Sequence, residues 1–224
     1  FAWKKYGDKK GTVWYNPTPE QVESVMTKPM GGFNCRKYDN HIVHSKMMGK
    51  SNMELYQQSQ SIISNNGGMI GSAYELSYID IYEYASKKQS LKKWEIELGI
   101  HHDELEFPWD QPLPEDKWTR AGEYCLNDVD AAGAVFDATK SDYTARKILS
   151  KLSGLSMNAK TQQHAEKFLF GNDPRPQDKF VYTDLSETFP GYKYEFGKST
   201  YRGEDPSEGG YVYSEPGVHK NVTL

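Results

Sequence analysis

Short β-type runs alternate with capped helices through residues 1–150, and this alternation restricts the chain to a mixed fold. Residues 1–15 predict a hairpin, because aromatic and β-branched residues flank a turn bounded by glycines. Thr18, Ser51 and Ser90 each lie just before an amphipathic run, where a hydroxyl can cap the first turn of a helix. Strands and helices in this order predict an α/β or α+β domain.

The composition changes at Asn172, after which prolines and glycines separate short aromatic runs. This punctuation predicts an extended linker with short strands rather than a second core. We therefore expect one domain over residues 1–150, followed by a helix and a linker over residues 151–224. The same local signals predict four further elements: a strand over 78–82, a helix over 91–98 that stops at Gly99, a helix from near Pro114 to Phe136 or Thr139, and a helix over 159–170.

The charge and composition fit a globular protein without a general nucleic-acid-binding surface. The net charge is −4 and 37% of the residues are hydrophobic. A protein that binds nucleic acid over a broad basic surface has the opposite charge balance, so any such contact is expected to be local. No run approaches the roughly 18 apolar residues of a membrane span. Cys35 and Cys125 are expected to be small buried fillers, in a reducing compartment.

Tyr124 and Asp128 form the most informative polar pair in the sequence. They are spaced i, i+4 on a predicted helix and so share one face. A carboxylate can hold a divalent cation and a phenol can orient an attacking water, as a metal-dependent phosphodiester hydrolase requires. Such a pair is commonly an ordinary surface contact, so the hypothesis depends on a second stretch upstream.

The second stretch is residues 32–39, in which Asn34 and Asp39 lie where a strand turns into a helix. Asp80 belongs to another predicted strand, so acids from separate elements can meet at one edge of a sheet. Clustered carboxylates without a Cys/His cluster favour Mg²⁺ over Zn²⁺. Each residue also has a structural alternative, since Asp39 or Asp80 can cap a helix and Asn34 can satisfy a turn.

These two stretches resemble motifs of a known family. Phe33-Asn34 followed by Tyr38-Asp39 resembles the second motif of the proofreading 3′–5′ exonucleases of DNA polymerases. Tyr124-x-x-x-Asp128 resembles the third motif of the DEDDy group of ribonuclease-H-like exonucleases, and the order of the two motifs agrees with that family.

The C-terminal residues add to this resemblance. Residues 208–212 and residues 201–203 are both candidates for the Tyr-x-Gly-Gly linker that precedes the first palm motif of family B polymerases. The resemblance covers most of the chain and is nearest to the DNA polymerases of bacteriophages. It implies a ribonuclease-H-like α/β fold, with a mixed sheet flanked by helices and an extended C-terminal linker.

The resemblance also implies roles for individual residues. Asp39 and Asp128 would be ligands in a two-metal site for Mg²⁺ or Mn²⁺, and Tyr124 would position the nucleophilic water. Single-stranded ends are gripped by aromatic and polar side chains, with basic residues on the phosphates. The residues implied as DNA contacts are Phe33, Asn34, Tyr38 and Lys92 or Lys93.

The sequence departs from the family in one respect: its first motif, Asp-x-Glu, does not occur in these 224 residues. The resemblance places that motif just before Phe1. Without it, two of the four metal-binding acids are missing, and we expect these residues alone to bind metal weakly and cleave poorly or not at all. Two alternatives remain: a non-catalytic module that binds single-stranded DNA or a primer end, and a free-standing nuclease.

The expected partners follow from the resemblance as well. A proofreading segment would act on single-stranded 3′ ends and primer–template DNA, together with the remainder of a polymerase chain, and without a membrane. A phage enzyme would work in the cytoplasm of its bacterial host. The lysine run over residues 87–93 has two interpretations, a solvated face or a phosphate contact beside the DNA path, whereas His101-His102-Asp103 is expected to be ordinary surface.

Overall fold

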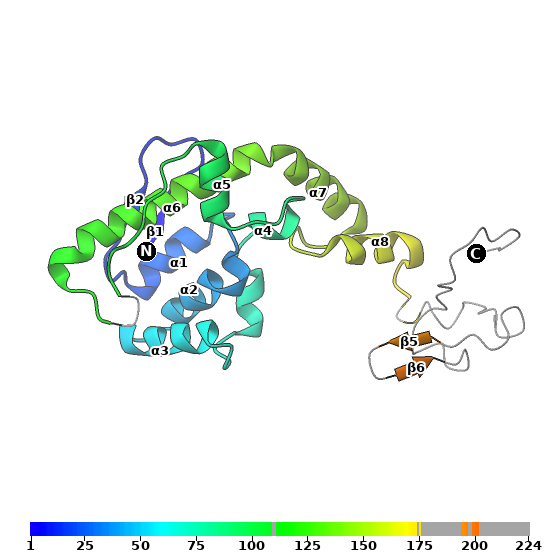
Figure 1. Ribbon diagram of the computed structural model, residues 1–224, viewed down its shortest axis with the longest axis horizontal. Helices are drawn as coiled ribbons and strands as arrows, with labels where there is room; N and C mark the ends of the chain where they lie inside the picture. Colours follow the sequence, from blue (N-terminus) through cyan, green and yellow to red (C-terminus); the bar gives the residue numbers. More distant parts are fainter. Residues whose placement is uncertain (109–110, 174, 176–193, 197–198, 202–224) are drawn as a thin grey trace, which may run out of the picture. The chain divides into compact units, whose positions relative to one another are not determined.

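The computed structural model describes residues 1–108, 111–173 and 175, and the backbone of two strands within residues 194–201 (Figure 1). The chain divides into two units, Phe1–Gly171 and Asn172–Leu224. In the second unit, β5 (Tyr194–Phe196) pairs antiparallel with β6 (Ser199–Tyr201), which are short strands of the expected kind. Residues 202–203 and 208–212, which belong to the two predicted linker signatures, lie outside the described residues.

The predicted N-terminal hairpin is confirmed. Strands β1 (Ala2–Trp3) and β2 (Thr12–Val13) pair antiparallel and lie against the long helix α6 (Trp118–Ala138). The ring of Tyr15 stacks on Trp118 at 6.1 Å between centroids. A β-carbon at Gly122 would lie 2.5 Å from the Tyr15 hydroxyl, so glycine allows this close approach.

Three helices follow the hairpin, and the caps expected from the sequence form. Helix α1 (Pro19–Met26) starts after a capping box at Thr18, and α3 (Asn52–Ile63) after one at Ser51. Between them, α2 (Asp39–Met47) packs against both neighbouring helices. A 3₁₀ turn at Cys35–Lys37 leads into α2.

The strand expected over 78–82 is shorter than predicted. Strand β4 (Ile79–Asp80) pairs in parallel with β3 (Gly31–Gly32), and the chain then turns into the short helix α4 (Ile81–Tyr84). The side chain of Asp80 accepts a hydrogen bond from the backbone N–H of Tyr82 and so caps α4. A local side-chain bond of this kind competes with continued strand pairing.

Helices α5 and α6 lie side by side in Figure 1 and contact each other. Helix α5 (Leu91–Leu98) is capped by Ser90 and ends at Gly99, whose φ is +65°, as the sequence predicts. The long helix was expected to begin near Pro114. Instead a 3₁₀ turn occupies Glu115–Lys117, and α6 begins at Trp118.

Helix α7 (Lys140–Ser153) was not predicted from the sequence. Its apolar residues Ala145, Ile148, Leu149 and Leu152 recur at helical spacing, but Ile148 and Leu152 are exposed. The inward face instead carries the polar residues Arg146 and Ser153. Helix α8 (Thr161–Phe170) agrees with the predicted helix over 159–170 and packs against α7.

A single core connects the central elements of the first unit. Ile79, Tyr84, Trp94 and Val135 are buried together, and Phe33 packs on their edge. The strands in the described part of the chain form three separate two-stranded pairs, so the expected larger mixed sheet is not present there. The fold is mixed α/β with helices predominant. Among the described residues, no helix combines the length and apolarity needed to cross a membrane.

Candidate functional site

Helix α6 places Tyr124 and Asp128 on successive turns of one face, as the sequence predicts. Burial raises the pKa of the Tyr124 hydroxyl, and the charge of Asp128 raises it further. The phenol is therefore a neutral donor at physiological pH, which suits a group that holds a water molecule.

Asp39 is the first residue of α2, and the preceding Tyr38 occupies the cap position. The capping alternative for Asp39 is therefore wrong. Although the residue as a whole is exposed, protein atoms crowd its carboxyl, and this desolvation raises its pKa to about 6, with Asp80 and Asp128 adding to the effect. The structure thus brings the acids of the two predicted motifs within electrostatic reach of each other.

Burial also raises the pKa of Asp128 to about 6, and the negative charge of Glu95 contributes. His102 and the Tyr124 hydroxyl act in the opposite direction. Both acids also act on Cys125: burial raises its thiol pKa, the N-terminal ammonium opposes this, and the charges of Asp128 and Asp39 raise it further. Cys125 is nevertheless an exposed residue, so the expectation of a buried filler is correct for Cys35 and wrong for Cys125.

A buried carboxylate beside Asp128 was missed by sequence reasoning. Glu95 on α5 is 2% exposed, and its Oε2 lies 2.6 Å from Nδ1 of His102. The side-chain amide of Asn127 on α6 donates to the other oxygen of Glu95 at 3.3 Å. Hydrogen bonds with Glu95 and then Glu104 raise the pKa of His102, which favours the charged imidazolium that balances Glu95.

The loop that carries His102 is tied to α6. Arg120 donates to both carboxylate oxygens of Asp103 at 2.6 Å, in the bidentate geometry that suits a guanidinium. The surface interpretation therefore holds for His101, which is exposed, whereas His102 and Asp103 are half-buried and form structural ion pairs.

Asp80 is a structural residue, as its capping alternative predicts. Its carboxylate accepts backbone N–H bonds from Asn34 at 2.8 Å and from Arg36 and Tyr82 at 3.0 Å. Asn34 has φ +54°, a left-handed conformation that asparagine tolerates better than most residues. The hydrogen bonds that Asp80 accepts hold the turn that leads from β3 to Asp39.

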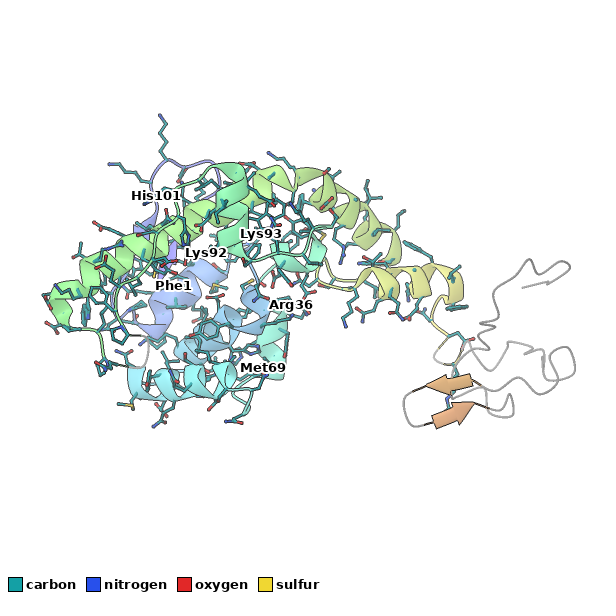
Figure 2. The ribbon with its side chains drawn as sticks, in the orientation of Figure 1. Phe1, Arg36, Met69, Lys92, Lys93 and His101 are labelled. Carbon is teal, nitrogen blue, oxygen red and sulfur yellow. The ribbon has the colours of Figure 1, made fainter. Side chains whose placement is uncertain are left out.

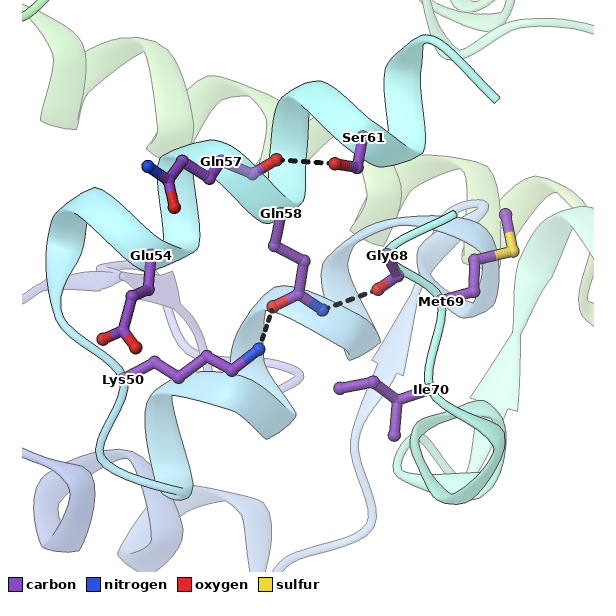
Figure 3. Close-up of a pocket in the computed structure, with 8 residues that line it drawn as sticks. All are labelled: Lys50, Glu54, Gln57, Gln58, Ser61, Gly68, Met69 and Ile70. Carbon is purple, nitrogen blue, oxygen red and sulfur yellow. Dashed lines mark hydrogen bonds between the residues drawn. The ribbon is translucent and has the colours of Figure 1, made fainter. Parts of the chain in front are cut away.

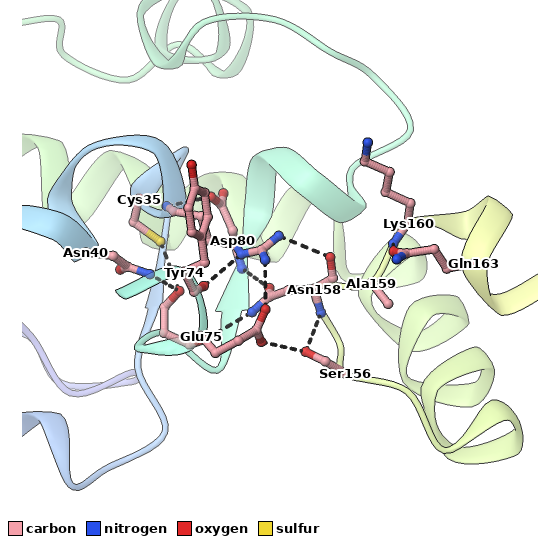
Figure 4. A network of polar contacts seen from close by, with 12 residues as sticks. Cys35, Asn40, Tyr74, Glu75, Asp80, Ser156, Asn158, Ala159, Lys160 and Gln163 are labelled. Atoms are coloured by element: carbon pink, nitrogen blue, oxygen red, sulfur yellow. Dashed lines mark hydrogen bonds and ion pairs between the residues drawn. The ribbon is translucent and has the colours of Figure 1, made fainter. Parts of the chain in front are cut away.

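A polar network anchors the same turn to the segment between α7 and α8 (Figure 4). The side chain of Asn158 accepts from the N–H of Asp80 and donates to the carbonyl of Ser77, both at 3.0 Å. Arg36 donates to the carbonyls of Tyr74 and Asn158 at 2.8 and 3.2 Å. The position of the second motif thus depends on residues far away in the sequence.

The two predicted aromatic DNA contacts lie in different surroundings. The half-buried ring of Phe33 meets Tyr82 edge-on at 5.8 Å between centroids. The Tyr38 hydroxyl lies 2.7 Å from Oγ of Ser59 on α3, so this phenol is already engaged within the protein.

The two predicted phosphate contacts, Lys92 and Lys93, also differ (Figure 2). Lys92 forms an ion pair with Glu104. Lys93 is exposed, and its ammonium has no ion-pair partner within the described residues. Of the two, Lys93 is the one whose charge is available to a phosphate.

The described part of the chain contains no group of three or more His, Cys, Asp or Glu side chains arranged to hold a metal ion. A cavity of about 420 Å³ lies elsewhere, on α3 and the segment that follows it (Figure 3). There Gln58 accepts from Lys50 at 3.3 Å and donates to the Gly68 carbonyl at 2.7 Å. None of the predicted site residues lines this cavity.

The arrangement is therefore a pair of carboxylates, Asp39 and Asp128. The Tyr124 phenol lies one turn from Asp128 on the same helix, and the charges of Glu95 and His102 act on Asp128. No protein-family model, curated protein or solved structure matches the chain in comparisons with known proteins.

Proposed function

We propose that this chain is the proofreading part of a DNA-directed DNA polymerase, which hydrolyses the 3′-terminal phosphodiester of a primer and releases a nucleotide. One observation carries the proposal: Asp39 and Asp128, which belong to two motifs far apart in the sequence, share one electrostatic environment with raised pKa values. Clustered carboxylates with perturbed pKa values are typical of functional sites.

The site residues fit a divalent cation, because a cation would neutralise carboxylates that the protein by itself disfavours as anions. Asp39 and Asp128 would hold Mg²⁺ or Mn²⁺ in a two-metal site. Bound ions of this kind polarise a phosphodiester and lower the pKa of a coordinated water. Tyr124 would orient that water with its hydroxyl, and Asn34 and Phe33 would hold the frayed 3′ end.

The wider context of the proposal rests on the order of the sequence motifs. It includes a ribonuclease-H-like arrangement, single-stranded 3′ ends and primer–template DNA as partners, the remainder of a polymerase chain, and a cytoplasmic location in a bacterial host. The Asp-x-Glu motif of that family, absent from these residues, would complete the set of acids.

Release of the terminal nucleotide from a 3′-labelled single strand tests the proposal. We expect slow release in Mn²⁺, abolished in Asp128→Ala and in the presence of a chelator. Glu123→Gln is the matched control, because Glu123 is an exposed acid on the same helix and its loss should leave release unchanged.

A second candidate function is favoured by one feature of the sequence, namely that these 224 residues contain no Asp-x-Glu motif. In that case the chain guides single-stranded DNA or a primer end without cleaving it. The same experiment distinguishes the two functions: binding of the strand, with no release in Mn²⁺ by the parent chain, favours the second.

A further inference from the structure

Two lysines converge on one tyrosine ring next to the candidate site. The ammonium of Lys37 lies 5.4 Å from the centroid of the Tyr82 ring, and the ammonium of Lys88 lies 5.2 Å from the same centroid. Lys37 comes from the turn before Asp39, whereas Lys88 follows α4. The ring of Phe33 contacts the Tyr82 ring edge-on. We call Phe33, Lys37, Tyr82 and Lys88 the Tyr82 surface.

The positive charge of this surface is only partly balanced. Lys37 is exposed and forms no ion pair among the residues that the structure describes. The ammonium of Lys88 donates to the main-chain carbonyls of Tyr82 and Glu83, which are neutral acceptors. The negative charges of Glu83 and Asp80 act on Lys88, but neither acid forms an ion pair with it among the described residues. An anion between the lysines would therefore be attracted by both.

The surroundings of Lys88 disfavour its charge slightly. Burial lowers its pKa, and the positive charges of Arg146 and Lys37 lower it further, against the opposing effects of Glu83 and Asp80. Binding of an anion would offset the repulsion between the cations. A lone phosphate would satisfy the lysines but would leave the aromatic rings of Phe33 and Tyr82 unused.

The surface is continuous with the candidate site through the backbone. Phe33 and Lys37 flank Asn34, and Asp39 follows two residues after Lys37. Asp80 contributes to the electrostatic environment of both Asp39 and Lys88. A strand with its 3′ end at Asp39 and Asp128 would therefore have a basic and aromatic surface beside it.

We propose that the Tyr82 surface binds the single strand just behind its 3′ terminus, with a phosphate between Lys37 and Lys88 and a base against the aromatic rings. Alternating cationic and aromatic groups are the usual means of holding single-stranded nucleic acid without reading its sequence. The inference rests on the proposed function for its ligand, and it assigns roles to Lys37, Tyr82 and Lys88 beyond the residues of the two motifs.

Fluorescence anisotropy with a labelled oligothymidylate in a chelator tests this inference, because hydrolysis is suppressed and only binding is measured. We expect Tyr82→Ala to weaken binding at least about fivefold, the lower end of a lost base–aromatic contact. We expect Lys37→Ala to reduce the slope of log affinity against log salt by about 0.7, the value for one single-strand phosphate contact. Lys9→Ala is the matched control, since Lys9 is an exposed lysine in the hairpin turn.

The outcomes separate this inference from the proposed function. Equal salt slopes for Lys37→Ala, Lys9→Ala and the parent chain would overturn it, as would failure of the parent chain to bind the strand. Lys37→Glu, also at an exposed position, should abolish the phosphate contact without loss of folding, which circular dichroism checks. Binding that depends on Lys37 and Tyr82 but without nucleotide release would uphold the inference while the hydrolytic function fails.

Discussion

The surroundings of Asp128 in the folded chain disfavour its ionised carboxylate. Its carboxyl is half-buried and faces the negative charge of Glu95, and its pKa is about 6. A raised carboxyl pKa means that the native state binds more protons than the unfolded state between pH 4 and 6, so the stability contributed by this group falls as the pH rises through that window. A residue that costs stability in this way is expected where a functional site needs it.

This reasoning predicts that Asp128→Asn stabilises the metal-free chain at pH 8. The gain should be on the order of 1 kcal/mol, after allowance for solvent screening of a half-exposed group. At pH 4 the parent and the variant should unfold at nearly the same temperature, because Asp128 is then largely protonated. Thermal unfolding in a chelator at both pH values measures this.

Glu123→Gln provides the comparison, since it removes an exposed charge from the same helix. A variant Asp128→Asn that is less stable than the parent at pH 8, with Glu123→Gln unchanged, would show that the carboxylate stabilises the fold and would refute the electrostatic argument.

At the scale of elements, the turn at residues 34–37 depends on partners from three other segments. The carboxylate of Asp80 accepts hydrogen bonds from the backbone of this turn, and the Arg36 side chain donates to the carbonyls of Tyr74 and Asn158. The Asn158 side chain in turn forms hydrogen bonds with the N–H of Asp80 and the carbonyl of Ser77. Buried networks of this kind fix one geometry only when every member is satisfied.

We predict that Asn158→Ala destabilises the chain by about 2–3 kcal/mol, because it leaves a buried N–H and a buried carbonyl without partners. Urea unfolding of the variant measures the loss. Asn66→Ala, at an exposed position, should change the stability by less than about 0.5 kcal/mol. Equal effects of the two substitutions would mean that the network does not support the turn.

The starts of α1, α3 and α5 were predictable from the sequence because caps are local. The hydroxyls of Thr18, Ser51 and Ser90 bond to backbone groups three residues away, so neighbouring residues suffice to predict them. Helix α7 was not predicted, although Ala145, Ile148, Leu149 and Leu152 recur at helical spacing. Which face it buries could not be predicted, because Ile148 and Leu152 are exposed while Arg146 and Ser153 face inward and bond to Ala159, His164 and neighbouring main-chain groups. Those partners are set by tertiary packing.

At the scale of the whole molecule, one core holds the elements that carry the site. Trp94, beside Glu95 on α5, is buried with Ile79 of β4 and Val135 of α6. The two helices that face each other across Glu95 and Asp128 are therefore held in register by apolar packing. The site geometry therefore depends on this core as well as on its polar contacts.

Removal of the central aromatic ring tests this dependence. Trp94→Ala should cost about 3–5 kcal/mol in the free energy of unfolding, the range for a large buried aromatic residue. Ile96→Ala on the same helix should cost less than about 0.5 kcal/mol, because Ile96 is 66% exposed. Denaturation in urea compares the two, and similar costs would contradict the assignment of the core.

The candidate site was only partly predictable for a related reason. The resemblance of the two motifs to one family predicted that Asp39 and Asp128 lie together, and each motif is a local pattern that can be found in the sequence. Glu95 and His102 carry no such pattern: Glu95 follows a core tryptophan in an ordinary amphipathic helix, and its partner comes from a loop of polar residues. The lysines at Tyr82 likewise meet only through the tertiary fold.

Binding of Mn²⁺, measured by electron paramagnetic resonance, tests the central claim most directly. The account predicts weak binding by the parent chain that strengthens as the pH rises through about 6, where Asp39 and Asp128 lose their protons. Asp39→Asn and Asp128→Asn should each reduce the affinity about tenfold or more, and Glu123→Gln should leave it unchanged. Equal Mn²⁺ affinity in all four chains, or none in the parent, would contradict a shared metal site.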